Sequence, residues 1–597
     1  MLITGITILC IVSILRAWEV LNYGRCLVFS VVLFVFIITI PAYAAAPPDA
    51  GQLLNEQRQI KPTLPDRLPK EGDQGVNRMP LTDQGIKVLV KGFKFTGGQG
   101  IVTDAELLVL LKDAIGKELG FADLQNLTVR VTAYLRDKKG YILASAYLPR
   151  QDITDGVIEI AIVAGRIEGK ARINVKEPRR IGQGLLEGIA ERSIPTGDAI
   201  RLENIERSVL LMNDLPGISA RASLERGELP GTARIVIDAV EGPLVSGFLS
   251  GDNYGDRYTG TWRGTGRPAI NDPFGLGDQF SISLTGAEHL YQGGAAYALP
   301  LGATGLTWST AYTALYYEVG GDLSNLNAKG NGQTVSTAIS YPFMRSRNTN
   351  LLSGLGFEYM SFHDEAGGVT TRDRKVPVGN LNLTGSFFDD FGGGGLTSLY
   401  LVLSYGDLRL SGTADAESTD ANSARSAESF VKANYSVARL QHITRLISIY
   451  GSAQGQFAGK NLDSSQKFIL GGPSRVRAYP TGEASGDEGH AFTFEVRLDL
   501  PVSPSWPVMQ LTGFYDAGYV NLHKNTWAGS VTNATGRNDY WLSGAGVGFN
   551  IGKAGLYSIR VSYALKINDN PGRSDAGYDA DNLKDYGRAW LQVTVWF

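Results

Sequence analysis

Cysteine is almost absent from this chain, since only Cys10 and Cys26 occur among its 597 residues. Both precede Ala44, where the sequence predicts cleavage, so the exported chain would contain no thiol. This excludes a disulfide framework and a thiolate metal site. The formal net charge of -3 also lacks the basic excess that is typical of nucleic-acid binders. The sequence therefore predicts no nucleic-acid partner.

Long apolar segments are missing as well. After Ala44 no apolar run reaches the roughly 20 residues that a membrane-spanning helix needs. If the chain resides in a membrane, it must span it by strands, because only helices and closed barrels satisfy the backbone there. The hydrophobic fraction of 43%, the 73 glycines and the 10% aromatic residues suit such a barrel, in which alternate residues face lipid and aromatic residues form girdles.

Motifs of catalysis and cofactor binding are also missing. No histidine pair has metal-ligand spacing, and neither H-E-x-x-H nor G-x-S-x-G occurs. Gly544–Gly548 lies in a strand pattern with no helix behind it, and Gly455–Lys460 lacks the spacing of a phosphate-binding loop. The sequence predicts no enzyme, no catalytic residue, no cofactor and no metal site, although the acidic loops leave a weak Ca²⁺ site open. The five histidines are His289, His363, His442, His490 and His523.

The N-terminus has the pattern of an export signal. The apolar run Leu27–Ile40 follows Arg25 and ends at Pro41–Ala44, a small-x-small cleavage pattern. The run is shorter than a spanning helix needs, so residues 1–44 are predicted to be a signal peptide rather than a retained membrane helix. The earlier apolar stretch Met1–Leu15 leaves two alternatives open, a longer signal or a start codon assigned too far upstream.

Residues 45–80 are rich in Pro, Gln, Asp and Gly. Within them, Asp49–Gln59 contains no proline and begins with a residue that caps helices well, so we expect a short helix there. Four prolines lie between Lys61 and Pro80, which is typical of an extended linker.

Two consecutive stretches, residues 81–167 and 168–242, have the same predicted order of elements, β-α-α-β-β. In the first, we expect these elements at Ile86–Phe95, Asp104–Ile115, Phe121–Lys138, Tyr141–Leu148 and Val157–Val163. In the second, we expect them at Ala171–Val175, Ile181–Arg192, Leu202–Asn213, Ile218–Glu225 and Thr232–Val240. The repeat indicates two tandem α+β modules.

Residues 243–597 alternate apolar with polar residues between Gly, Asn and Asp turns. At roughly 22 residues per strand and connection, this length suits about sixteen strands of a transmembrane antiparallel β-barrel. An array of soluble β-sandwiches is the alternative, but it would need domain linkers that the sequence lacks. The final strand, Ala589–Phe597, has an apolar face that could contact lipid. Such a face, ending in a terminal Phe, is the pattern that outer-membrane barrels present to their assembly machinery. The alternative is an ordinary edge strand, but an edge strand with this much exposed apolar surface would invite aggregation. That face includes Leu591, Val593, Val595 and Phe597.

Three motifs stand out in the predicted barrel: Asp252–Arg263 (DNYG…TG…R), Gly471–Arg497 with its Val476–Tyr479 (VRAY), and Phe514–Gly518 (FYDAG). With the module repeat, they resemble the outer-membrane transporters of two-partner secretion, of the haemolysin secretion/activation type. There they correspond to the first barrel strand, to an inward-folded loop whose hallmark is Val-Arg-Gly-Tyr, and to F-x-D-x-G on a later strand. Alanine at residue 478 raises the question whether this position needs a positive φ, which alanine tolerates poorly. Over the whole mature chain the resemblance implies a plug helix at Asp49–Gln59, a linker, two POTRA modules and a sixteen-stranded barrel.

Strand alternation places Phe514, Asp516 and Gly518 on one face. A carboxylate cannot cheaply face lipid, so we expect Asp516 to face the lumen. There it could form bidentate hydrogen bonds with Arg477 and fix the loop, while Gly518 leaves room for close approach. The alternatives are a solvated loop arginine and an ordinary lumen-wall charge. The predicted members of this loop lock are Val476, Arg477, Tyr479, Phe514, Asp516 and Gly518, with Gly471 and Gly472 as loop glycines.

The resemblance implies that the protein exports a large partner exoprotein without nucleotide hydrolysis. The POTRA modules would capture the unfolded partner by strand addition, for which Tyr141–Leu148 and Ile218–Glu225 offer candidate edges. The plug helix would first have to leave the lumen, and a mobile plug is consistent with a short polar helix on a Pro-rich tether, which we expect to bury little apolar surface. A monomer in outer-membrane lipid, inserted by the barrel-assembly machinery, is expected. Haemolysin, adhesin and contact-inhibition toxin stay open as partners, as does activation of the partner.

An outer-membrane insertion factor of the same superfamily is the main alternative, since it shares the POTRA modules, the arginine loop and the terminal strand. Two modules and a plug-like segment favour secretion. A passive porin would need no capture modules, and an enzyme has no supporting motif.

Overall fold

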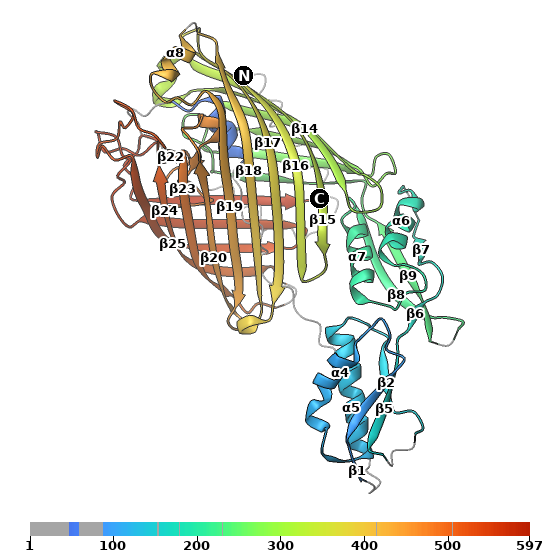
Figure 1. Cartoon of the computed structure of the whole chain (residues 1–597). Helices are drawn as coiled ribbons and strands as arrows, with labels where there is room; N and C mark the ends of the chain where they lie inside the picture. The colour runs from blue at the N-terminus through green and yellow to red at the C-terminus, as the bar shows by residue number, and fades with distance from the viewer. Residues whose placement is uncertain are drawn as a thin grey trace. The chain divides into compact units, whose positions relative to one another are not determined.

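The computed structural model describes residues 47–58, 87–151, 155–177, 180–229, 231–413, 415–503 and 506–597. The predicted signal peptide and the proline-rich linker lie outside the described residues. In the described ranges, no helix is both long and apolar enough to cross a membrane. The described chain forms a short N-terminal helix, two α+β modules and a closed barrel (Figure 1).

The first module has two strands where one was predicted. β1 (Lys87–Leu89) pairs with β3 (Glu118–Gly120), whereas β2 (Gly92–Thr96) pairs in parallel with β5 (Val157–Val163). The chain changes partner at Val90, whose N–H donates to the carbonyl of Lys117. The other elements are α4 (Asp104–Leu111), α5 (Phe121–Ala133) with a π-helical turn to Lys138, and β4 (Ser145–Tyr147), which is shorter than predicted.

The second module has the predicted order of elements after one added strand, β6 (Arg166–Ile167), which lies just before the predicted start of the module at residue 168. Its central strand β9 (Thr232–Glu241) pairs in parallel with β6 (Arg166–Ile167) and β7 (Arg172–Val175), and antiparallel with β8 (Ile218–Arg226). The helices α6 (Gln183–Ser193) and α7 (Leu202–Asn213) lie beside this sheet (Figure 1). Their buried apolar side chains form one cluster with those of the sheet. Within the part of the chain that the structure describes, the outer edge of β8 pairs with no strand.

Sixteen antiparallel strands close into one barrel, as the sequence predicts. Consecutive strands pair throughout, and the first closes against the last through Phe248–Asp252 and Gln592–Trp596. Exposed apolar side chains alternate with inward-facing ones, because successive residues of a strand point to opposite faces. The strands are β10 (Val245–Asp252), β11 (Arg263–Asn271), β12 (Gln279–Gly286), β13 (Leu290–Pro300), β14 (Thr307–Glu318), β15 (Ala328–Arg345), β16 (Thr349–Ala366), β17 (Val369–Asp389), β18 (Gly395–Ser411), β19 (Glu428–His442), β20 (Ile447–Ala458), β23 (Glu488–Asp499), β24 (Val508–Asn521), β25 (Asp539–Lys553), β26 (Tyr557–Lys566) and β27 (Gly587–Trp596).

The two ends of the barrel differ. At the end where the second module joins β10, connections such as residues 346–348, 443–446 and 554–556 are short. At the far end, several are long, and the loop after β18 contains the helix α8 (Ala416–Ala421). Short turns at one end and long loops at the other are typical of outer-membrane barrels.

The N-terminal helix α3 (Ala50–Gln57) lies inside the barrel, where Asp49 caps it by accepting from the N–H of Gln52. Ala50, Leu53 and Leu54 are buried among apolar wall residues. The expectation that this helix buries little apolar surface was therefore wrong. Positions 50, 53 and 54 form an i, i+3, i+4 stripe, which is the pattern of a helix with one packed face.

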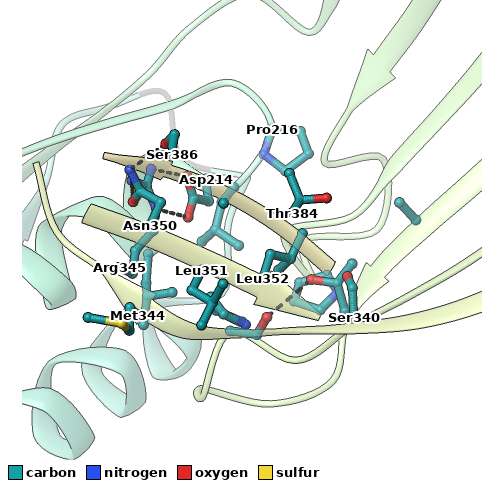
Figure 2. A pocket seen from close by; sticks show the side chains of 18 of the residues that line it. Asp214, Pro216, Ser340, Met344, Arg345, Asn350, Leu351, Leu352, Thr384 and Ser386 are labelled. Carbon is teal, nitrogen blue, oxygen red and sulfur yellow. Dashed lines mark hydrogen bonds and ion pairs between the residues drawn. The ribbon is translucent and has the colours of Figure 1, made fainter. Parts of the chain in front are cut away.

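A pocket of about 870 Å³ lies where α7 meets the barrel. Arg345, at the end of β15, donates from Nε and Nη2 to Asp214 at 2.8 and 2.6 Å, and from Nη1 to Asn350 (Figure 2). Apolar side chains of both the module and the barrel line the pocket, among them Leu211, Leu215, Pro300, Leu351 and Leu352. The second module thus contacts the barrel through an ion pair beside an apolar hollow.

Candidate functional site

The connection between β20 and β23, residues 459–487, folds into the barrel and is here called the inward loop. It contains the helix η5 (Ser464–Gln466) and two short strands that pair with each other, β21 (Phe468–Ile469) and β22 (Ser485–Gly486). The two predicted loop glycines lie at its turn. Gly471 bridges to Val476, and Gly472 has φ 117°, a conformation that favours glycine.

Arg477 and Asp516 form a bidentate ion pair inside the barrel. Nε of Arg477 donates to Oδ2 of Asp516 and Nη2 to Oδ1, both at 2.8 Å. The backbone N–H of Arg477 and Oγ1 of Thr493 also donate to this carboxylate, at 3.2 and 3.0 Å. Asp516 is only 1% exposed, and a buried carboxylate depends on such pairing because it has lost its water.

Two further side chains surround the Arg477 guanidinium. Its Nη1 donates to Glu495 Oε1 at 2.8 Å, and the other oxygen of Glu495 accepts from Arg497 at 2.9 Å. Cζ of Arg477 lies 3.4 Å from the ring centre of Phe514, which is a cation–π contact. Glu495 was not among the predicted residues. Its signal was present, since Thr493, Glu495 and Arg497 alternate with apolar residues and so share the inner face of β23.

Ala478 stands where the resembling family has glycine. It is not among the residues with positive φ, so alanine carries no backbone strain here. The wall provides the space for its methyl group, because Gly544 on β25 faces it. A Cβ at residue 544 would lie only 2.4 Å from that of Ala478. Gly544 on the barrel wall thus makes the room that the methyl group of Ala478 needs in the loop.

Gly518 and Tyr479 complete the packing. A Cβ at residue 518 would lie 2.3 Å from Cδ1 of Leu470, so glycine allows the loop to lie directly on β24. The hydroxyl of Tyr479 donates to the carbonyl of Asn568 at 3.3 Å. Val476, Tyr479 and Phe514 belong to one buried cluster. The structure therefore brings the predicted lock residues together.

The C-terminal strand also contacts the inward loop. Nε1 of Trp590 on β27 donates to the carbonyl of Arg477 at 2.7 Å, and its ring meets Tyr254 edge to face. The predicted C-terminal row lies on the opposite face of the strand. In that row, Leu591 and Val593 are half-buried, while Val595 and Phe597 are exposed.

A second polar cluster fixes the helix α3. Its cap Asp49 accepts from Ser464 Oγ of the inward loop at 2.8 Å, and Asp364 on β16 accepts from the N–H of Ala50 at 3.0 Å. Arg374 on β17, 2% exposed, donates to Asp364 at 2.6 Å and lies 3.3 Å from Asp49. No local sequence motif could have indicated this cluster, because Asp49 and Ala50 lie more than three hundred positions from Asp364 and Arg374 in the sequence. They connect the helix to both the wall and the loop.

The described residues contain no group of three or more His, Cys, Asp or Glu side chains that could hold a metal ion. The chemistry of the lumen is that of ion pairs and close packing. Such an arrangement holds segments in place inside a pore.

Two α+β modules followed by a closed sixteen-stranded barrel define a POTRA-bearing outer-membrane protein. Residues 231–551, more than half of the chain, match the family model "Haemolysin secretion/activation protein ShlB/FhaC/HecB", and residues 88–165 match the ShlB-type POTRA domain. The chain belongs to the haemolysin secretion/activation family. It is an outer-membrane transporter of two-partner secretion, and its POTRA modules lie in the periplasm.

Relatives along most of the chain agree with this assignment. The heme/hemopexin transporter protein HuxB of Haemophilus influenzae (strain 86-028NP) is 28% identical over 558 residues, 92% of this chain and 96% of HuxB. The outer membrane transporter CdiB of Escherichia coli O6:K15:H31 (strain 536 / UPEC) is 23% identical over 514 residues, 83% of this chain and 84% of CdiB. The solved structure of CdiB from Escherichia coli has the same fold, with a TM-score of 0.66 at 21% identity, covering 92% of this chain and 96% of CdiB.

Proposed function

We propose that this transporter carries its unfolded partner exoprotein through the lumen that α3 and the inward loop occupy. One observation carries the proposal: both segments are fixed by side-chain contacts inside a barrel whose strands close without them. Both can therefore leave the lumen while the wall stays intact. Folding of the partner outside the cell would give the movement its direction.

We propose that the loop lock serves this transport by holding one loop conformation. Arg477→Ala and Asp516→Ala are each expected to reduce the amount of partner at the cell surface while the barrel stays inserted. Immunoblots of the culture medium and heat-modifiable migration of the barrel measure the two effects. Normal export by both variants would contradict the proposal.

We propose that α3 is a plug, although it is more firmly packed than its sequence suggests. Deleting Asp49–Gln59 should raise the ion conductance of the protein in planar bilayers. Unchanged conductance would show that the helix does not obstruct the pore.

We propose that the partner enters at the periplasmic end, where the free edge of β8 and the apolar hollow beside Asp214 lie. An unpaired strand edge offers backbone hydrogen bonds to an extended segment, and apolar hollows accept its side chains. Proline substitution in β8, compared with the same substitution in an exposed turn, tests this entry by partner capture.

The proposed division of the chain is a signal peptide at residues 1–44, plug helix and linker at 45–80, POTRA modules at 81–167 and 168–242, and the barrel at 243–597. Mass spectrometry of the N-terminus of the purified protein tests the first boundary. We further propose a monomer in outer-membrane lipid, inserted by the barrel-assembly machinery and without catalytic activity, for which light scattering after size exclusion measures the oligomeric state.

A partner that serves haem acquisition is the first candidate to test. This rests on HuxB, which is named a heme/hemopexin transporter and matches this chain over a larger share and at higher identity than CdiB does. A large secreted protein encoded in the neighbouring reading frame, tested for binding to hemopexin, would support the candidate. A neighbour with a toxin domain would contradict it.

A further inference from the structure

A pocket of about 160 Å³ lies beneath the tip of the inward loop, on its periplasmic side. Arg497 is close to the periplasmic end of β23, and Arg560 lies near the periplasmic start of β26. Four guanidinium groups line this pocket, together with a single carboxylate, that of Glu495. The four are Arg475, Arg477, Arg497 and Arg560.

The lining carboxylate is already engaged. Its Oε1 accepts from Arg477 and its Oε2 from Arg497. Asp516, behind Arg477, is likewise occupied by the lock. Acidic side chains at the pocket are therefore committed to two of the arginines.

Arg475 differs from these two arginines. It is 7% exposed, and its guanidinium donates to the carbonyl of Ile469 and to Oε1 of Gln454 at 3.3 Å. Its Cζ lies 4.1 Å from the ring centre of Phe468. Among the residues that the structure describes, no carboxylate forms an ion pair with Arg475. A buried charge without a counter-charge is costly, so the pocket is electrostatically suited to an anion.

We propose that this arginine pocket binds carboxylate groups of the polypeptide in transit, namely the acidic side chains of the exoprotein. Planar guanidinium groups hold a carboxylate through paired hydrogen bonds, and the pocket volume matches a small side-chain head rather than a folded element. The inference rests on the proposed function for the source of the carboxylate. Binding has to be weak enough for release, as at any site within a conducting pore.

The pocket would then act as a first resting point for the chain before it passes the inward loop. An acidic residue that occupies it would compete with Glu495 for Arg497 and give Arg475 the counter-charge it lacks. Because the incoming carboxylate takes the place of Glu495 on Arg497, while Glu495 keeps its hydrogen bond from Arg477, the exchange leaves no buried charge unpaired.

The test uses full-length protein with Ser474→Cys, since Ser474 lines the pocket and its side chain is half-buried. N-ethylmaleimide labelling of residue 474 is followed by mass spectrometry, with and without peptide. The probes are an unstructured N-acetylated, C-amidated peptide containing glutamates, the same peptide with glutamines, and inorganic phosphate. The glutamate peptide is expected to slow labelling, the glutamine peptide is not, and raising the salt is expected to weaken the effect by screening.

Arg475→Gln and Arg560→Gln should each weaken protection by roughly tenfold, the loss of about one charge-assisted hydrogen bond. Arg445→Gln, on an exposed periplasmic turn, removes the same charge and should leave protection unchanged. Heat-modifiable migration shows whether each variant is folded. If Arg475→Gln does not fold, the test depends on Arg560→Gln alone.

Equal protection by the two peptides would overturn the proposal, as would an equal loss in Arg445→Gln. Protection by phosphate with none by the glutamate peptide would show a site for free anions instead. These outcomes differ from a failure of the proposed function. If the protein does not export a partner, the glutamate peptide would still bind, but no partner would reach the cell surface.

Discussion

The Arg477–Asp516 pair allows a quantitative prediction for the inward loop. Arg477→Ala removes two of the four donors to Asp516 and the only positive charge that reaches it at ion-pair distance among the described residues. Removing one partner of a buried pair costs about 3–5 kcal/mol, because the remaining charge is left unpaired. If the inward loop moves away from the wall, water can solvate the Asp516 carboxylate again. The lost stabilisation should therefore appear as local opening of the loop.

Hydrogen exchange of peptides from residues 468–486 measures that opening in the full-length protein. At about 1.36 kcal/mol for each factor of ten, protection should fall by roughly 10² to 10⁴. The double variant Arg477→Ala, Asp516→Ala also removes the stranded carboxylate and should recover part of the protection. Barrel strands such as β16 should keep theirs, since the wall does not depend on the pair.

The matched control is Arg409→Ala, because Arg409 forms an ion pair with Asp407 at 2.7 Å while its side chain is 70% exposed. Exposed pairs contribute up to about 1 kcal/mol, so loop protection should not change. The reasoning would be refuted by less than a tenfold loss in Arg477→Ala, or by a double variant that is as poorly protected as the single one.

Three further predictions use other contacts. Gly544→Ala should cost about 1–3 kcal/mol of loop stability by overpacking, because its Cβ would lie 2.4 Å from that of Ala478 and 2.9 Å from the carbonyl oxygen of Leu565. Ala478→Gly in the same chain should restore part of this stability, and thermal unfolding without any rescue would contradict the contact with Ala478. Asp49→Ala removes the cap of α3 and its ion pairs and should raise conductance in planar bilayers; an unchanged trace would contradict that anchoring role. Glu106 has its pKa lowered to about 2, because Lys139 donates to its carboxylate, so its contribution to helix α4 should be complete above the usual value near 4.5 and lost as the pH falls toward 2. Protection factors of α4 should show this loss, and Glu106→Gln should remove the pH dependence.

The parts of the fold that follow local rules could be predicted from the sequence. Alternation along residues 243–597 is sufficient for the barrel, because the period of two is imposed by the lipid and the lumen together. The module repeat likewise follows from helical and strand periods. The division of the first predicted strand at Val90 could not be predicted, because it depends on the distant partners Lys117 and Gly156.

The candidate site was predictable only where one strand or one motif carries it. Asp516 faces inward by alternation, and a lumen carboxylate needs a partner, but it is the resemblance of Val476–Tyr479 to the family's loop motif that points to Arg477. Arg374 and Asp364 could not be predicted, because nothing local relates them to Asp49. The burial of one face of α3 could be predicted, because Ala50, Leu53 and Leu54 form an apolar stripe at helical spacing in the sequence.

The two polar clusters also set an order for opening the pore. The hydrogen bonds between the helix α3 and the inward loop lie in the early part of the loop, where Ser464 donates to the helix cap and Asn55 donates to the carbonyl of Lys467 at 2.6 Å. Later in the loop, Gly482 packs beside Gln52 and Glu56 of the helix. The donors of Arg477 all reach the wall strands β23 and β24 instead. The helix can therefore leave while the loop lock stays closed, but release of the loop removes part of the surface on which the helix lies. Asp49 variants should then raise conductance without reducing protection around Arg477, whereas Arg477 variants should reduce that protection and also raise conductance. The opposite pattern would show that the helix holds the lock.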